Sequence, residues 1–372
     1  PDGSVKKFKA RFCARGDRQK EGIDYFETYA PVVQWTTIRL MLILECLLGL
    51  KSKQGDVTCA FLHALLEENE KVHLKMPQGF KQYDSRGREK VLSLRRSLYG
   101  LKQAPRAFWK YMVAKMKEVG MRQSDFDPCL FIGDKCIAVM YVDDVLMWST
   151  NEDNIRELGM KLRDKGVDLE EEDDAAGFLG VKLTKIPETG QMIMTQEGLI
   201  TRIIEALGLD TDKSTPRNTP CLKAPLFKDV DGDPASGNFS YASIVGMLLY
   251  LSGHSRPDIA YSVSQVARFT FSPKHSHEQA LKLIGRYLLA TRDKGLVLTP
   301  SKELNIDAYP DADFAGLWGY EDKMDPICVR SRTGYVINVA KCPILWKSQL
   351  QTETATSTMM AEGIALSASC RE

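Results

Sequence analysis

The stretch that decides the fold is Cys136-Ile137-Ala138-Val139-Met140-Tyr141-Val142-Asp143-Asp144-Val145-Leu146-Met147-Trp148. Two apolar, β-prone runs flank Asp143-Asp144, and two turn-type residues between such runs predict a β-hairpin. Adjacent carboxylates repel each other, and burying them without partners costs several kcal/mol each. In isolation such a pair is most simply a solvated turn. A divalent cation is the other way to accommodate the two charges.

A third carboxylate favours the cation. Asp56 lies near the end of another apolar-flanked strand, in Asp56-Val57-Thr58-Cys59-Ala60-Phe61-Leu62. Three carboxylates that converge on one sheet edge would form a hard-oxygen site for Mg²⁺. Two such ions, about 4 Å apart, can activate an attacking hydroxyl and stabilise the leaving oxygen in phosphoryl transfer.

The composition is that of an ordinary globular protein and excludes several other classes. The 372 residues predict two or three domains, and 44% of them are hydrophobic, which argues against disorder. Fifty Lys and Arg against 49 Asp and Glu give a net charge of +1, so a polyanion site must come from local clustering. Nine cysteines without a C-x-x-C pair indicate a reducing compartment. The longest apolar run, 40–50, is too short to span a membrane, and the chain begins like a piece of a longer protein.

Periodicity and breakers predict the remaining elements. In the first half we expect a basic half-buried strand over 6–18 and a buried helix that is capped by Thr36 or Thr37 and ends at about Leu48. Further strands are expected over 71–76 and 178–183, helices over 106–119 and 151–165, and a solvated loop at 170–174. In the second half we expect a linker over 210–237, helices over 241–250, up to Phe269, over 277–291 and over 359–369, and strands over 304–310, 334–339 and 344–346. His275 and His277 are expected to be helix-start residues rather than metal ligands.

Several motifs together resemble one protein family. Tyr141-Val142-Asp143-Asp144 resembles the YxDD hairpin of reverse transcriptases. The segments 9–16 (KARFCARG), 25–33 (YFETYAPVV), 97–106 (SLYGLKQAPR) and 256–261 (RPDIAY) are similar to the Pol polyprotein of copia-type LTR retrotransposons. The resemblance covers nearly the whole chain in the same order. It implies an α+β right-hand polymerase with reverse transcriptase fingers and palm over 1–190, thumb and linker over 191–238, a connection over 239–302 and a partial, truncated RNase H-like domain over 303–372.

The resemblance also assigns roles to individual residues. Asp56, Asp143 and Asp144 match the catalytic, metal-binding carboxylates of the palm, and the carbonyl of Val57 matches a further metal ligand. Phe61 matches the steric gate that favours deoxynucleotides, although a core Phe after a strand would look the same. The other matches are Lys9 and Arg11 for the incoming triphosphate, Tyr99 and Lys102 in the loop beneath the nascent base pair, and Phe178, Leu179 and Gly180 for the primer grip.

Two carboxylates match the metal ligands of RNase H. They are Asp311, in YPDADFAG, and Glu362, in MAEGIAL. At residues 359–363 this chain has Met-Met-Ala-Glu-Gly, where the family usually has Thr-Glu-Ala-Glu-Tyr. As bare sequence they are a turn Asp and a surface Glu. The sequence ends at Glu372 before the segment that would supply the remaining Asp, so we predict that this chain has no RNase H activity.

The resemblance therefore predicts an RNA-directed DNA polymerase that uses two Mg²⁺ ions, with Mn²⁺ as a substitute. Its partners would be an RNA template, a DNA primer, the RNA–DNA hybrid, dNTPs and the integrase and protease segments of the polyprotein, with no membrane. Its location would be a cytoplasmic virus-like particle or the nucleus. The alternatives are an inactive or domesticated fragment that only binds nucleic acid, and an RNA-dependent RNA polymerase, which Phe61 and Val142 disfavour.

Overall fold

The computed structural model describes residues 10–172, 177–211 and 214–372, and Lys9 lies outside this range. The chain divides into two compact units. The first comprises residues 1–38 and 49–175, and the second comprises residues 39–48 and 176–372, so the division runs through one helix. The expected division into palm, thumb, connection and RNase H-like segments remains a prediction.

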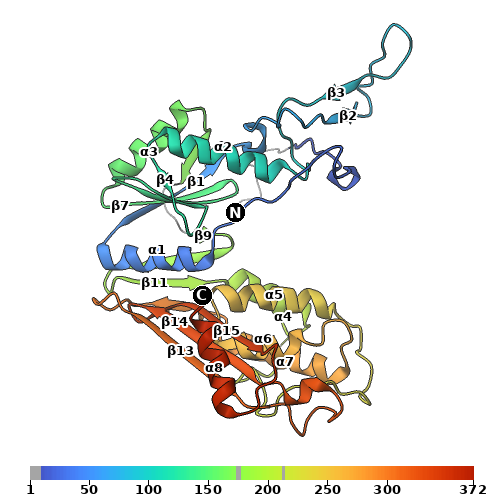
Figure 1. Ribbon diagram of the computed structural model, residues 1–372, viewed down its shortest axis with the longest axis vertical. Coiled ribbons are helices and arrows are strands. Elements are labelled where there is room, and N and C mark those ends of the chain that lie inside the picture. Colours follow the sequence, from blue (N-terminus) through green and yellow to red (C-terminus); the bar gives the residue numbers. More distant parts are fainter. Residues whose placement is uncertain (1–9, 173–176, 212–213) are drawn as a thin grey trace. The chain divides into compact units, whose positions relative to one another are not determined.

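The first unit is built on a six-stranded antiparallel sheet with the order β4-β5-β6-β7-β1-β8. Its strands are β1 (Lys51–Val57), β4 (Arg122–Gln123), β5 (Leu130–Ile132), β6 (Ile137–Tyr141), β7 (Asp144–Ser149) and β8 (Leu169–Glu172). Helices α2 (Ala104–Glu118) and α3 (Glu152–Asp164) cover one face of this sheet (Figure 1). Alternate strand residues such as Met140, Val145 and Met147 point toward these helices and are buried among their apolar side chains.

The predicted hairpin of residues 136–148 is confirmed, but its turn differs by one residue. Tyr141 pairs with Asp144, so the turn consists of Val142 and Asp143, and Asp144 is the first residue of β7. Val142 takes up the left-handed backbone conformation with φ 52°. The two-residue turn therefore lies one residue earlier in the sequence than predicted, and only Asp143 of the two aspartates belongs to it.

Two helices within residues 10–172 begin earlier than predicted, and the first of them is divided between the two units. Helix α1 (Trp35–Leu48) starts at Trp35 rather than after Thr36 or Thr37, and Gly49 ends it with φ 64°. The hydroxyl of Thr37 instead donates to the carboxylate of Asp127 at 2.7 Å. Helix α2 begins at Ala104 with Pro105 in its first turn, where the missing N–H of proline costs nothing. Helix α3 begins at Glu152, one residue later than predicted, and Asn151 caps it, because its side chain accepts from the Asp153 amide at 3.0 Å.

Two predicted elements of this unit are wrong. The described part of 6–18 forms no strand: it contains only the short helix η1 (Gly16–Arg18) and is held by a hydrogen bond of 2.8 Å from the Ala14 amide to the Tyr99 carbonyl. The acidic residues 170–172 do not form a loop but belong to β8, because they pair with β1. Asp173 and Asp174 lie outside the described residues.

A two-stranded antiparallel hairpin completes the first unit. Strands β2 (His73–Lys75) and β3 (Val91–Ser93) pair with each other and with no other strand of the described chain. The strand predicted over 71–76 is thus confirmed in shortened form. The hairpin extends away from α2 and α3 in Figure 1. The short helix η2 (Ala60–Leu62) lies between β1 and this hairpin in the sequence.

The second unit combines helices with two antiparallel sheets. Its helices are α4 (Glu197–Ala206), α5 (Tyr241–His254), η3 (Pro257–Ile259), α6 (Ala260–Ala267), α7 (His275–Ala290), η4 (Pro326–Val329) and α8 (Thr358–Ser369). The strands are β9 (Gly177–Phe178), β10 (Val181–Ile186), β11 (Gln191–Thr195) and β12 (Leu296–Leu298) in one sheet, and β13 (Ile306–Asp313), β14 (Arg332–Val339) and β15 (Cys342–Leu350) in the other. Helices α4 to α7 share one apolar core, and α8 packs on β13 and β14.

Most predicted elements of this unit are confirmed, with one correction. The strand expected over 178–183 is two short strands, β9 and β10, joined by a turn at Leu179 and Gly180, which both have positive φ. His275 and His277 lie in the first turn of α7, as predicted, and a His277 ring nitrogen accepts from the Lys274 amide at 2.8 Å. No described helix is both long and apolar enough to span a bilayer.

Candidate active site

The strand register brings Asp56, Asp143 and Asp144 to one edge of the first unit's sheet. Asp56 in β1 lies directly opposite Asp144 in β7. The amide of the next residue, Val57, donates to the carbonyl of Asp143 at 2.8 Å. All three aspartates are half-buried. Because directly opposed residues of an antiparallel pair share a face, the side chains of Asp56 and Asp144 lie on the same side of the sheet.

Two further polar residues occupy this face, and the sequence analysis did not identify either. Gln54 precedes Asp56 by two residues, so both side chains lie on the same face of β1. The Gln54 side-chain amide donates to Oδ1 of Asp144 at 3.1 Å, although Gln54 is only 7% exposed. Its own Oε1 is buried, and no hydrogen-bond donor for it is found in the described chain. The spacing of two residues from Asp56 was the available signal.

Glu170 adds a fourth carboxylate to the row. It lies opposite Asp56 in the pairing of β1 with β8, so Glu170, Asp56 and Asp144 occupy neighbouring positions on three adjacent strands. Glu170 is exposed, whereas the two aspartates are half-buried. The sequence predicted a solvated loop at 170–174, and a run of acidic residues does have low β propensity.

The donor atoms at this edge are suited to a hard cation, since carboxylate and carbonyl oxygens are the ligands that Mg²⁺ prefers. Among residues 10–172, 177–211 and 214–372, no three His, Cys, Asp or Glu residues are grouped so that they could hold a metal ion. The aspartates therefore fit Mg²⁺ in donor chemistry, while their side chains do not form a closed ligand set.

An aromatic cluster lies beside the carboxylates. The ring of Phe61, in η2, contacts Tyr99 edge-on with a centroid distance of 5.0 Å and Phe108 with a centroid distance of 6.1 Å. The guanidinium carbon of Arg11 lies 5.6 Å from the Tyr99 ring centre, a cation–π arrangement. Segments from three distant parts of the sequence thus meet at Tyr99.

The ionisation of Tyr99 links this cluster to the carboxylates. Burial raises the pKa of Tyr99, and nearby Cys59 and Asp143 raise it further, whereas Arg11 lowers it and Asp56 adds a smaller upward contribution. Tyr99 therefore lies within electrostatic reach of two of the three aspartates and of Arg11.

Two glycines allow the N-terminal segment to approach the Tyr99 loop. A Cβ at Gly16 would lie 1.9 Å from the Gly100 carbonyl oxygen, and a Cβ at Gly100 would lie 2.2 Å from the carbonyl oxygen of Ala14. Lys102, in the same loop, donates to the Tyr25 hydroxyl at 3.2 Å. Residues from the 9–16, 25–33 and 97–106 motifs therefore contact one another.

The remaining predicted site residues belong to the second unit. Phe178 is buried in β9, while Leu179 and Gly180 form the turn before β10. The Tyr250 hydroxyl donates to the Leu179 carbonyl at 2.7 Å. Asp311 lies in β13 and Glu362 in α8, and both are exposed. Their predicted roles as primer grip and RNase H remnant remain predictions.

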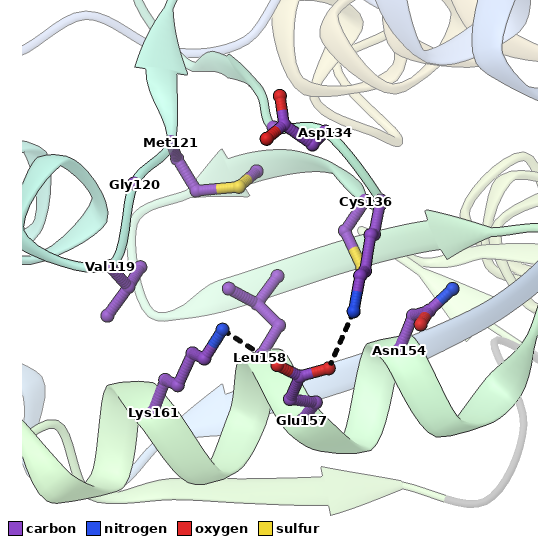
Figure 2. Close-up of a pocket in the computed structure, with 11 residues that line it drawn as sticks. Val119, Gly120, Met121, Asp134, Cys136, Asn154, Glu157, Leu158 and Lys161 are labelled. Atoms are coloured by element: carbon purple, nitrogen blue, oxygen red, sulfur yellow. Dashed lines mark hydrogen bonds and ion pairs between the residues drawn. The ribbon is translucent and has the colours of Figure 1, made fainter.

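One cavity of the first unit lies away from the carboxylates. It has a volume of about 180 Å³ and lies between α3 and the turn at 133–136, which precedes β6, whereas Asp143 follows that strand (Figure 2). Glu157 accepts from Lys135 at 3.4 Å and pairs with Lys161 at 2.8 Å. Burial raises the pKa of the Cys136 thiol, which keeps this thiol protonated. We assign no role to this cavity.

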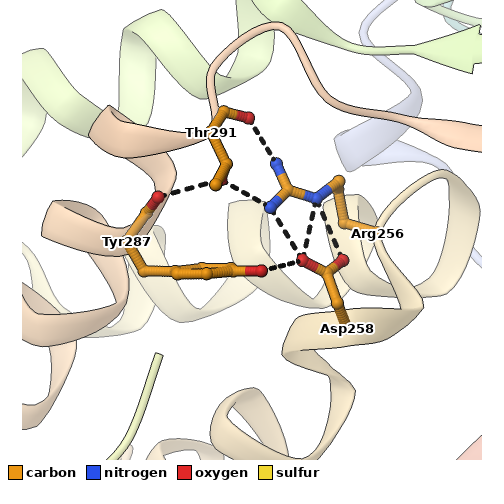
Figure 3. A network of polar contacts seen from close by, with 4 residues as sticks. All are labelled: Arg256, Asp258, Tyr287 and Thr291. Atoms are coloured by element: carbon orange, nitrogen blue, oxygen red, sulfur yellow. Dashed lines mark hydrogen bonds and ion pairs between the residues drawn. The ribbon is translucent and has the colours of Figure 1, made fainter. Parts of the chain in front are cut away.

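The 256–261 motif forms a buried polar network in the second unit (Figure 3). Arg256 is 2% exposed and donates to both carboxylate oxygens of Asp258 at 2.8 to 3.2 Å and to the carbonyl of Thr291 at 3.0 Å. The hydroxyl of Tyr287 donates to Asp258 at 2.8 Å. This network connects η3 with α7, so the motif is structural in this unit.

A family profile and several curated proteins match this chain. The profile, described as reverse transcriptase (RNA-dependent DNA polymerase), matches residues 2–223. The Retrovirus-related Pol polyprotein from transposon RE1 of Arabidopsis thaliana is 34% identical over 97% of this chain and 24% of its own length. The corresponding polyprotein from transposon TNT 1-94 of Nicotiana tabacum is 34% identical over 100% of this chain and 28% of its own length.

A third relative has the same coverage. The Retrovirus-related Pol polyprotein from transposon RE2 of Arabidopsis thaliana is 32% identical over 97% of this chain and 24% of its own length. The chain thus spans about a quarter of the length of these three relatives.

Proposed function

Because the chain belongs to the reverse transcriptase family and resembles copia-type retrotransposon Pol polyproteins, we propose that it is an RNA-directed DNA polymerase. It would add deoxynucleotides to the 3′-hydroxyl of a primer annealed to an RNA template. The observation that carries the proposal is the register of β1 against β7, which sets Asp56 opposite Asp144 and next to Asp143. In this proposal residues 1–190 form the fingers and palm, 191–238 the thumb and linker, 239–302 the connection and 303–372 the partial RNase H-like domain, so the fingers and palm include residues of both units.

Asp56, Asp143, Asp144 and the Val57 carbonyl would hold two Mg²⁺ ions, or Mn²⁺ in their place. When bound, such ions lower the pKa of the attacking hydroxyl and neutralise charge on the phosphoryl group. The three carboxylates are strongly anionic together, so they would also exclude a nucleotide that arrives without its cations.

The aromatic cluster would select the nucleotide. Phe61 is held between Tyr99 and Phe108, so its ring cannot easily move away from a 2′-hydroxyl. Arg11 would grip the triphosphate, because its planar fork donates in pairs to phosphate oxygens. Lys9 would assist it. Tyr99 and Lys102 would support the nascent base pair, and Phe178, Leu179 and Gly180 would hold the primer.

The wider setting follows from the relatives, whose names identify them as Pol polyproteins. We propose that the integrase and protease segments of such a polyprotein are partners of this chain. We further propose that this protein acts in a cytoplasmic virus-like particle or in the nucleus.

Primer extension on a defined RNA template, with Mg²⁺ or Mn²⁺, tests the proposal. The parent should extend the primer, and Asp143→Asn should reduce the rate by several orders of magnitude. Asp134→Asn is the matched control, because Asp134 lies in the turn at the other end of β6 and is exposed. Equal extension by the parent and Asp143→Asn would contradict the assignment of Asp143.

The choice of sugar gives a second test. Phe61→Val should increase incorporation of NTPs relative to dNTPs, because it removes the ring that would meet the 2′-hydroxyl. A parent that prefers NTPs would instead indicate an RNA polymerase.

A further inference from the structure

The hairpin arm, residues 71–96, concentrates positive charge that the rest of the chain lacks. It carries eight Lys or Arg residues against two carboxylates, a net charge of +6 within 26 residues. The other 346 residues carry 42 basic and 47 acidic side chains, a net charge of −5. The basic residues of the arm are Lys71, Lys75, Lys81, Arg86, Arg88, Lys90, Arg95 and Arg96, and all eight are exposed.

Most of this charge is not neutralised within the arm. Lys81 pairs with Glu89 at 3.1 Å and Arg88 pairs with Asp84 at 2.8 Å, which uses both carboxylates. For the other six basic residues, the described chain shows no ion pair. Glu67, which precedes the arm, is itself paired with Lys110 of α2.

The register of β2 and β3 gives the arm two different faces. Leu74 and Leu92 lie opposite each other and are half-buried, and Leu74 packs on the cluster that contains Leu101. Lys75 and Val91 form the next pair along the ribbon, so they point the other way and are exposed. Lys71 and Arg95, which lie just outside the two strands, are also exposed.

The far end of the arm presents aromatic rings on an ordered turn. Phe80 is 71% exposed and Tyr83 is 56% exposed. The carboxylate of Asp84 accepts from the amides of Arg86 at 2.8 Å and Arg88 at 2.9 Å, which fixes the turn beyond Tyr83. Both aromatic side chains are thus exposed to solvent near this turn rather than packed into the core.

We propose that the hairpin arm binds single-stranded nucleic acid without sequence preference. Basic side chains that follow a phosphate backbone, together with rings on which unpaired bases stack, are the two components of such sites. A duplex would gain from the charges but not from the rings, because its bases are already stacked. The identity of the strand as the unpaired template rests on the proposed function, but the binding itself does not.

Fluorescence anisotropy with a labelled 20-nucleotide oligouridylate tests this proposal. The full chain is used in EDTA, without primer or dNTPs, so the result does not depend on polymerase activity. The charge variant combines Lys71→Gln, Lys75→Gln, Lys90→Gln and Arg95→Gln. Its control combines Arg292→Gln, Lys294→Gln, Lys302→Gln and Lys323→Gln, four exposed positions outside the arm.

At 100 mM salt the charge variant should bind the oligouridylate about tenfold more weakly than the parent, or more weakly still. Its plot of log association constant against log salt concentration should be less steep than the parent's by about 3, since four phosphate contacts are lost and each contributes roughly 0.7. The affinity of the control variant for oligouridylate should stay within about twofold of the parent's affinity. Phe80→Ala with Tyr83→Ala should weaken binding about fivefold or more with the slope unchanged, because stacking carries no net charge.

Two results would overturn the proposal. One is a charge variant that keeps the parent's affinity and slope. The other is competition by polyglutamate that equals competition by unlabelled oligouridylate at the same charge concentration, which would make the arm a site for acidic polypeptide. Loss of primer extension with oligouridylate binding intact would count against the proposed function alone.

Discussion

The side-chain amide of Gln54 donates a hydrogen bond of 3.1 Å to Oδ1 of Asp144 across the β1–β7 pair. The bond joins a buried neutral donor to one of the three aspartates to which we assign metal binding. A hydrogen bond to a charged group contributes roughly 1.5–3 kcal/mol. Gln54 therefore fixes the position of one Asp144 oxygen, and it acts as a positioning residue if the proposed function is correct.

Replacement of Gln54 should therefore reduce extension without removing a metal ligand. Gln54→Leu keeps the volume and loses the donor, so we expect primer extension to slow roughly ten- to hundredfold and the half-saturating Mg²⁺ concentration to change. Gln54→Glu should be slower still, because a second carboxylate would repel Asp144. Gln123→Leu is the control, since Gln123 lies in β4 of the same sheet and donates to Pro128 instead. An unchanged rate and Mg²⁺ titration for Gln54→Leu would show that this bond has no positioning role.

The contact between Gly100 and Ala14 predicts a difference in stability between two glycines. Both Gly100 and Gly79 have φ 89°, but only Gly100 has a neighbour that a Cβ would meet, the Ala14 carbonyl oxygen at 2.2 Å. Gly79→Ala should lose stability only because alanine disfavours this positive φ, whereas Gly100→Ala must also displace a main-chain atom. We expect the free energy of unfolding, measured by urea denaturation, to fall by about 1–3 kcal/mol more for Gly100→Ala.

Equal losses for the two variants would mean that the segment around Ala14 shifts at no cost. Weaker dNTP binding by Gly100→Ala would also be expected under the proposed function, because the displaced segment contains Arg11.

The local sequence predicts the β6–β7 hairpin and most helices because alternation, caps and breakers act over a few residues. It does not predict the turn at Val142 and Asp143, since the cross-strand register decides which aspartate is paired. Glu170 shows the same limit: its acidic neighbours favour a loop, but pairing with β1 outweighs their propensity.

The site is predicted only as far as its residues belong to motifs. Asp56, Asp143 and Asp144 stand out by type and flanks, and the structure brings their backbones together. The one signal for Gln54 is its spacing of two residues from Asp56, which is weak because a single polar residue in a strand is common and its partner lies 90 residues away. The sequence does not mark the hairpin arm as a basic patch, because its charges are spread over a segment interrupted by Pro77, Gly79 and Gly87.

The Arg256 network predicts that charge alone cannot replace a guanidinium. Arg256 donates to Asp258 and Thr291 through three nitrogens, and its guanidinium carbon lies 5.5 Å from the Tyr287 ring centre. Arg256→Lys keeps the charge but not the fork, so the free energy of unfolding should fall by about 2–4 kcal/mol. Arg156 forms exposed ion pairs on α3, so Arg156→Lys should change the free energy of unfolding by less than about 0.5 kcal/mol. Similar small losses in both variants, measured by urea denaturation, would show that the network is not structural.

His254 predicts how the stability of this protein depends on pH. Burial lowers the pKa of His254 to about 4, the backbone hydrogen bond with Tyr250 acts in the opposite direction, and Arg39 lowers the pKa further. In the unfolded chain a histidine titrates near 6.5. Between about pH 4 and 6.5 the unfolded state therefore binds more protons, so this contribution is complete above about pH 6.5 and is lost as pH falls toward 4.

Comparison of the parent with His254→Gln isolates this contribution, because both proteins keep the same carboxylates. We expect the parent's free energy of unfolding to decrease more steeply than that of the variant as pH falls from 6.5 to 4.5, and the two curves to run parallel above pH 7. The ring of His254 is stacked on Tyr250 at a centroid distance of 4.0 Å, so protonation must occur within this contact or break it. Parallel curves across the whole range would mean that the ring gains access to water at no cost and that its burial does not resist protonation.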